Sequence, residues 1–109
     1  MYDQSSRPAL VWRVAIIPEN NPYPLQGRSR EVTLQNAGIF LPHPLPLQSR
    51  CKLIFESPAP DRKTHHYVEA QASVTYSTLV GGKNEYRTGF RLLDIHPEHR
   101  AILEKELRY

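Results

Sequence analysis

The chain has 109 residues, a length that fits one domain with a modest hydrophobic core. Hydrophobic residues make up 39% of it and charged residues 23%, which excludes a disordered chain, and the net charge of +3 permits an anionic partner without requiring one. No apolar run is long enough for a transmembrane helix, and the first residues lack the apolar core of a signal peptide, so we expect a cytoplasmic protein. Ten prolines against five glycines favour short strands and stiff loops over long helices.

Apolar, β-branched segments predict four short strands in the first half of the chain. They span residues 10–17, 30–34, 39–41 and 52–56. Between them, residues 18–27 predict a loop and 36–38 a turn. Residues 42–46 carry proline at every second position, which predicts a rigid connector, with a polyproline II recognition sequence as the alternative. Residues 1–9 are polar and predict a mobile N-terminal arm.

The second half begins with the clearest pattern in the chain, apolar and polar residues alternating over 68–77, which predicts a strand with one buried face. Paired glycines at 81–82 predict a hairpin turn, and residues 86–93 the returning strand. A helix is expected at about 97–107, because Pro97 suits its first position and Ile102, Leu103 and Leu107 give it an apolar face to dock on the sheet. Residues 10–109 therefore predict one all-β barrel or sandwich with a terminal helix.

Few residues suggest catalysis. The single cysteine, Cys51, lies in a strand-like run and is interpreted as a small buried residue. His96 and His99 stand three apart at the helix start and suggest a metal site, but no second ligand pair with zinc spacing accompanies them. No nucleophile motif or pair of acid and base residues is present. We expect no enzyme activity, no cofactor and no metal.

The basic residues form the one chemical pattern, concentrated in the first half of the chain. They are Arg7, Arg13, Arg28, Arg30, Arg50 and Lys52. Arg28 and Arg30 would lie on one face of a strand, where two guanidinium groups can bind phosphate oxygens. Ordinary surface charge is the alternative. Because no helix-turn-helix or aromatic platform for bases is present, nucleic acid is the minor partner candidate.

Several segments resemble the PilZ domain family. Residues 32–41 are similar to its corner between the second and third strands, residues 68–74 to its long strand and residues 86–95 to its last strand, and the helix after Pro97 completes the likeness. The resemblance covers residues 7–107. It implies a six-stranded antiparallel barrel with a C-terminal helix. It also implies a bacterial signalling role, in which PilZ domains bind the second messenger cyclic-di-GMP and control motility or biofilm formation through pili, flagella or exopolysaccharide machinery.

The family binds the dinucleotide through R-x-x-x-R in the arm and D/N-x-S-x-x-G at the corner. Here the arm offers Arg7 and Arg13, with the wrong spacing, and the corner places Thr33, Gln35 and Gly38 at the motif positions, so only the glycine is kept. These five residues are the candidate ligand-binding set.

An R-x-x-x-R string does occur at Arg87 and Arg91, on the last predicted strand. Its even spacing puts both residues on one strand face, and we interpret the match as coincidence.

The resemblance and its departures together predict a binding domain whose cyclic-di-GMP site is weakened. Loss of one arginine and the motif aspartate removes charge-assisted hydrogen bonds worth roughly 1.5–3 kcal/mol each, or about two to four decades of affinity. We therefore expect an adaptor that acts through a protein partner in motility or exopolysaccharide control. The alternatives are a genuine cyclic-di-GMP receptor with a variant arm and, from a different class, a basic barrel that binds nucleic acid.

Overall fold

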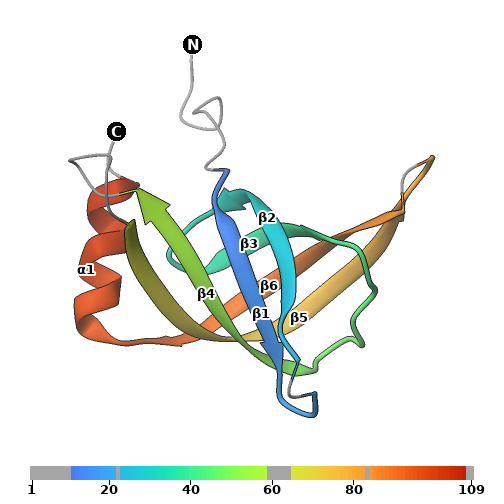
Figure 1. Ribbon diagram of the computed structural model, residues 1–109. Helices are drawn as coiled ribbons and strands as arrows, with labels where there is room; N and C mark the ends of the chain where they lie inside the picture. The colour runs from blue at the N-terminus through green and yellow to red at the C-terminus, as the bar shows by residue number, and fades with distance from the viewer. Residues whose placement is uncertain (1–10, 22, 59–64, 83, 108–109) are drawn as a thin grey trace.

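The computed structural model describes residues 11–21, 23–58, 65–82 and 84–107. Its elements in chain order are β1 (Arg13–Pro18), β2 (Leu25–Val32), β3 (Asn36–Leu41), β4 (Arg50–Pro58), β5 (His65–Val80), β6 (Glu85–Ile95) and α1 (Pro97–Glu106). All neighbouring strands are antiparallel, and the order β1-β2-β3-β6-β5-β4 closes into a barrel (Figure 1). The expected six-stranded antiparallel barrel with a C-terminal helix is confirmed.

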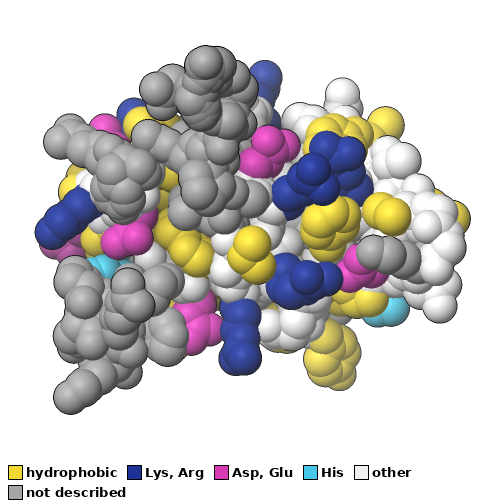
Figure 2. All heavy atoms as spheres, turned by 90° about the horizontal axis from the view of Figure 1, so that it is seen from above, with side chains coloured by type: hydrophobic (Ala, Val, Ile, Leu, Met, Phe, Trp, Pro, Cys, Tyr) yellow, Lys and Arg dark blue, Asp and Glu magenta, His cyan; other side chains and the backbone are white. Residues whose placement is uncertain are grey.

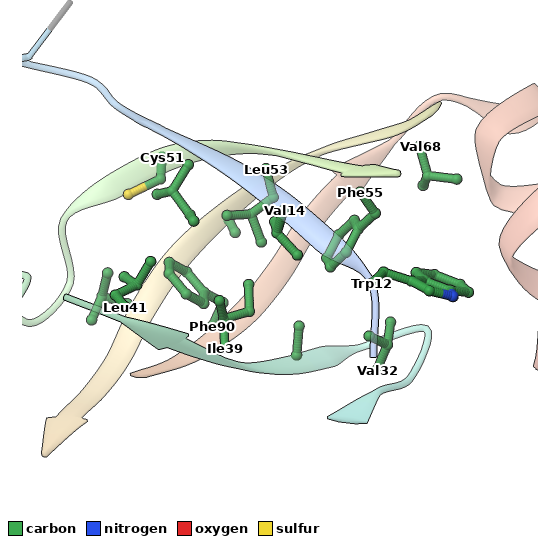
Figure 3. Packing of buried hydrophobic residues seen from close by; sticks show 14 of the residues in the cluster. Trp12, Val14, Val32, Ile39, Leu41, Cys51, Leu53, Phe55, Val68 and Phe90 are labelled. Atoms are coloured by element: carbon green, nitrogen blue, oxygen red, sulfur yellow. The ribbon is translucent and has the colours of Figure 1, made fainter. Parts of the chain in front are cut away.

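All six strands contribute side chains to one apolar core inside the barrel (Figure 3). Phe55 of β4 and Phe90 of β6 are among its largest fully buried side chains. Burying a side chain of this size contributes roughly 1.5–3 kcal/mol. At one end of the barrel Trp12 meets Phe55 edge to face, with ring centroids 6.3 Å apart. Its backbone N–H donates to Ser29 Oγ at 2.9 Å, which ties the start of β1 to β2.

Strand β2 starts earlier than the sequence predicted. Residues 25–27 were expected to lie in a loop, but they pair with residues 14–16 of β1. The reason is tertiary: a Cβ atom on Gly27 would lie 2.6 Å from the carbonyl oxygen of Phe40, so the glycine belongs to a close strand contact and not to a turn.

The turn predicted at residues 36–38 is wrong, because these are the first residues of β3 and pair with residues 89–91 of β6. The chain reverses three residues earlier. Thr33 Oγ1 accepts hydrogen bonds from the N–H groups of Gln35 and Asn36 at 3.2 and 2.9 Å, and the Thr33 N–H donates to the carbonyl of Asn36 at 2.8 Å. A threonine hydroxyl thus supplies the turn that residues 36–38 were expected to make.

Strands β5 and β6 form a long hairpin that projects from the side of the barrel opposite α1 (Figure 1). They have 16 and 11 residues, longer than the alternating pattern predicted. The paired glycines do lie at the hairpin turn, where Gly82 adopts a φ of 77°. Register shifts after Gln71 and Val74 add local twist to the hairpin.

The connector that follows β3 lies against this hairpin. The Leu45 N–H donates to Ser77 Oγ at 3.3 Å, and Gln48 and Val74 are joined by a backbone hydrogen bond of 2.8 Å. Residues 42–46 form no strand, as their alternating prolines predicted.

Helix α1 begins after His96, whose Nδ1 accepts a hydrogen bond from the Glu98 N–H at 3.1 Å. Leu103 is fully buried in the core, and Ile102 and Leu107 pack partly against it, so the expected docking face is confirmed. Glu98, in the first turn of the helix, is exposed. None of the helices among the described residues combines the length and apolar character needed to cross a bilayer.

Candidate functional site

The corner between β2 and β3 brings three of the five predicted ligand residues together. The Thr33 hydroxyl is occupied by the turn, since it accepts two backbone N–H groups and donates to the Asn36 carbonyl at 3.3 Å. Gln35 is exposed, and its backbone carbonyl accepts the Leu92 N–H at 2.8 Å, which ties the corner to β6. Thr33 therefore stabilises the turn at this corner, but it does not supply the carboxylate that an aspartate would supply at this motif position.

Gly38 lies two residues into β3, paired with Glu31 of β2 on one side and Gly89 of β6 on the other. Its neighbours Ala37 and Ile39 face the core, so Gly38 opens on the outer face of the barrel. A Cβ atom on Gly38 would lie 3.3 Å from both Cγ and Oε1 of Glu31. The space that this glycine leaves is thus covered by a carboxylate.

Gly89 lies beside Gly38 on the same outer face and is covered in a similar way. Its partner on β5 is Tyr76, and the tyrosine ring packs so closely over Gly89 that a Cβ atom there would overlap it. Tyr76 is 38% exposed, so one side of the ring faces solvent. An aromatic ring over a strand glycine covers backbone that would otherwise be open to water.

Arg87 and Arg91 flank Gly89 on β6. They pair across the sheet with Phe40 and Asn36 of β3, on either side of Gly38. Both are exposed, and neither has an ion pair with any of the residues that the structure describes. The R-x-x-x-R string that the sequence analysis set aside thus lies beside the one motif residue that is kept.

The remaining predicted arginines lie elsewhere. Arg13 begins β1, opposite Arg28 of β2, two strands away from β3, and Arg7 lies outside the described residues. Arg28 and Arg30 are both exposed, but the register of β2 against β3 shifts between Ser29 and Glu31, so Arg30 has no pairing partner on β3. Arg28 donates to Glu85 of β6 in a 2.8 Å ion pair. Figure 2 shows one face of the molecule, on which basic, acidic and hydrophobic side chains lie near one another.

A shallow hollow of about 500 Å³ lies at the Arg28–Glu85 ion pair. Its lining includes Arg13, Gln26, Gly27, Phe40 and Pro42. Arg30 is not part of this lining and Arg28 is paired with Glu85, so the two arginines predicted to bind phosphate do not meet in the hollow.

The two histidines considered for a metal site have structural partners. His96 Nδ1 caps α1, and His99 Nδ1 accepts the Glu69 N–H of β5 at 3.1 Å. A ring nitrogen that accepts an N–H bond uses the lone pair that a metal would need. A hollow of about 550 Å³ lies beside them between β5, β6 and α1. Among the described residues, no group of three or more histidine, cysteine, aspartate or glutamate side chains is arranged to hold a metal ion.

Cys51 is 2% exposed, which confirms the predicted burial. Burial raises the pKa of its thiol, the nearby Glu19 carboxylate raises it further, and a hydrogen bond with Ser49 acts in the opposite direction. The neutral thiol is therefore favoured, which is the opposite of what an attacking cysteine needs.

Among solved structures, the barrel is similar to that of the Bacillus subtilis inhibitor of motility (MotI/DgrA), with a TM-score of 0.73 and 15% sequence identity. The similarity covers 90% of this chain and 46% of that protein, so the chain spans about half the length of the structure it matches. No protein-family model and no curated sequence matches the chain. The likeness supports a PilZ-like fold, as the sequence resemblance implied, and at this identity it carries the fold alone.

Three residues of this face were not predicted as site residues: Glu31, Gly89 and Tyr76. Their importance comes from cross-strand neighbours that are far apart in the chain, and no local motif marks them. The alternation over 68–77 places Tyr76 with the buried apolar residues, but the register shift after Val74 turns it to the outer face. Only the register of β3 and β6 shows that Gly38 and Gly89 lie side by side.

Proposed function

We propose that this chain is a PilZ-type signalling domain of the bacterial cyclic-di-GMP network that acts by binding and not by catalysis. Its dinucleotide site is weakened, and it works mainly as an adaptor for a protein partner in motility or exopolysaccharide control. The observation that carries this proposal is the Glu31 carboxylate over Gly38, with Oε1 3.3 Å from the position of a Cβ atom there.

The charge at this point disfavours the messenger. Cyclic-di-GMP carries two phosphate charges, and a ligand that approaches the Gly38 backbone must displace or face Glu31. A like charge at about 4 Å costs about 1 kcal/mol in bulk water and up to about 4 kcal/mol near a protein surface. The corner offers no carboxylate at Thr33 to compensate through hydrogen bonds to the ligand.

The fold gives independent support. The structural neighbour is described as an inhibitor of motility, and this chain shares the fold of about half of it. A small barrel with a charged, filled outer face is suited to contact another macromolecule, and the described residues show neither a metal cluster nor a reactive thiol.

Calorimetry with cyclic-di-GMP tests the proposal. The expected result is no binding, or a dissociation constant well above about 1 μM. A constant near or below that value, abolished by Arg7→Ala, would refute the weakened site.

The second candidate is a genuine cyclic-di-GMP receptor with a variant arm, and the specific observation in its favour is Arg87 and Arg91 beside Gly38. It predicts that added messenger orders residues 1–13, which hydrogen exchange would detect as new amide protection. Unchanged exchange in this segment at saturating messenger would exclude it.

A further inference from the structure

The outer face around Gly38 and Gly89 combines exposed positive charge with aromatic surface. We call it the arginine face and define it as Arg87, Gly89 and Arg91 of β6, Gly38 and Phe40 of β3, and Tyr76 of β5. Arg87 and Arg91 are four residues apart on one strand, so their Cα atoms are about 13 Å apart.

The arginine face is filled rather than hollow. Glu31 lies over Gly38 and the Tyr76 ring lies over Gly89, so the two positions without side chains are both occupied by neighbours. A small ligand gains most of its affinity from a concave site that surrounds it. A flat, filled surface instead suits a partner that contacts it over an extended length.

The charges on the arginine face have a defined order. Arg87 and Arg91 lie at its two ends without ion pairs to described residues, whereas Arg28 nearby is neutralised by Glu85. The Glu31 carboxylate lies over Gly38 of β3, beside the stretch of β6 that separates the two arginines. A chain bound along β6 is therefore attracted by the two arginines and repelled by the Glu31 carboxylate beside the stretch between them.

We propose that the arginine face binds an acidic, extended segment of a partner protein, which lies along β6 with one carboxylate on Arg87 and another on Arg91. In an extended chain, side chains four residues apart point to the same side and are separated by about 13 Å, which matches the arginine spacing. Apolar side chains of the segment pack on Phe40 and Tyr76. This inference rests on the proposed adaptor role and names the chemistry of the partner.

A nucleic acid fits this surface less well. Its phosphates follow one another closely along the backbone, so a strand that reaches both arginines also places phosphate against Glu31. A peptide can carry a neutral residue at that position. The test below includes an oligonucleotide because binding of that class would overturn the inference.

The experiment uses the full chain, labelled with ¹⁵N, and three ten-residue synthetic peptides. The first carries two glutamates four residues apart with a threonine midway, the second has the same composition with the glutamates three apart, and the third replaces the midway threonine with glutamate. Chemical-shift titration gives the affinity and the location of each.

The first peptide is expected to shift amides of β3 and β6 and to bind about fivefold more tightly than the second, whose glutamates point to opposite sides of an extended chain. The third is expected to bind no better than the first despite its extra charge. Arg87→Gln or Arg91→Gln should weaken the first peptide about fivefold, while Arg100→Gln on α1 serves as the matched control and leaves it unchanged. Thermal unfolding of each variant checks that the barrel is intact.

Equal binding of the first two peptides, shifts that fall outside β3 and β6, or equal weakening by Arg100→Gln would overturn the inference. Tighter binding of an arbitrary single-stranded oligonucleotide to the same amides, with a steep dependence on salt, would also overturn it. Titration with cyclic-di-GMP alone distinguishes failure of the proposed function from failure of the acidic-segment proposal. Micromolar messenger binding would refute the weakened site, whereas weak messenger binding without peptide selectivity would refute only the acidic segment.

Discussion

Replacing the Glu31 carboxylate should raise the affinity for cyclic-di-GMP, and this prediction tests how the site is weakened. Glu31→Gln keeps the length of the side chain over Gly38 but removes its charge. A phosphate oxygen that reaches Gly38 would come within about 4 Å of the former carboxylate. Removing the repulsion is worth about 1–2 kcal/mol on this half-open face, or a five- to thirtyfold gain in affinity.

A second set of changes rebuilds the family motif on the same background. Thr33→Asp and Gln35→Ser restore D-x-S-x-x-G with Gly38 already in place. The structure predicts that the turn tolerates them, because an aspartate oxygen can accept the N–H groups of residues 35 and 36 that Thr33 Oγ1 accepts now. Each new charge-assisted hydrogen bond adds roughly 1.5–3 kcal/mol, so the triple variant should gain at least two decades over the parent chain.

Calorimetry at constant salt measures both steps, and Glu104→Gln on α1, a helix that packs on β5, is the matched control. If the parent chain binds with a dissociation constant of about 1 mM, a gain of about two decades brings the triple variant into the range that calorimetry measures. If Glu31→Gln and the triple variant bind the messenger no better than the control, the corner between β2 and β3 is not where the ligand lies, and the reasoning fails.

Three further predictions concern the barrel itself. Gly27→Ala should destabilise the fold by about 1–3 kcal/mol in urea unfolding, because its Cβ atom would lie 2.6 Å from the Phe40 carbonyl oxygen, whereas Gly81→Ala, with open space around it, should change little; equal effects would contradict this. Leu103→Ala should cost about 2–4 kcal/mol and lower the amide protection of α1, and unchanged protection would show that the helix docks by other contacts. Cys51 should resist iodoacetamide until the protein unfolds. Rapid alkylation of the native protein at pH 8 would contradict the burial argument. Because the pKa of the Cys51 thiol is raised in the fold, its contribution to stability is present below the pKa of the unfolded thiol and is lost as pH rises through the folded value.

Much of the barrel could be predicted from local patterns. The alternation in residues 68–77, the paired glycines at 81–82 and the proline-led helix after His96 each correspond to an observed element. These signals depend on neighbours within a few residues, where one buried face or one turn conformation decides the structure. The errors fell at residues 25–27 and 36–38, where a loop-like composition is overridden by pairing with distant strands.

The candidate site was less accessible to sequence reasoning. The motif positions at Thr33, Gln35 and Gly38 were found by resemblance, and the corner does bring them together. The arginine string on β6 was found but set aside, because nothing in its own segment places it next to Gly38. Glu31 and Tyr76 could not be found, since their contacts with the glycines cross between strands.

The amino-acid order alone determined most of the strand segments, the terminal helix with its apolar face, and that residues suited to catalysis are scarce. These properties follow from side-chain periodicity and backbone preference, which act over short distances along the chain. Only closure of the barrel decided that two glycines meet on its outer surface, that a carboxylate and a tyrosine cover them, and that two exposed arginines stand on either side. Strand register sets these contacts, and register depends on how all six strands fit around one shared core.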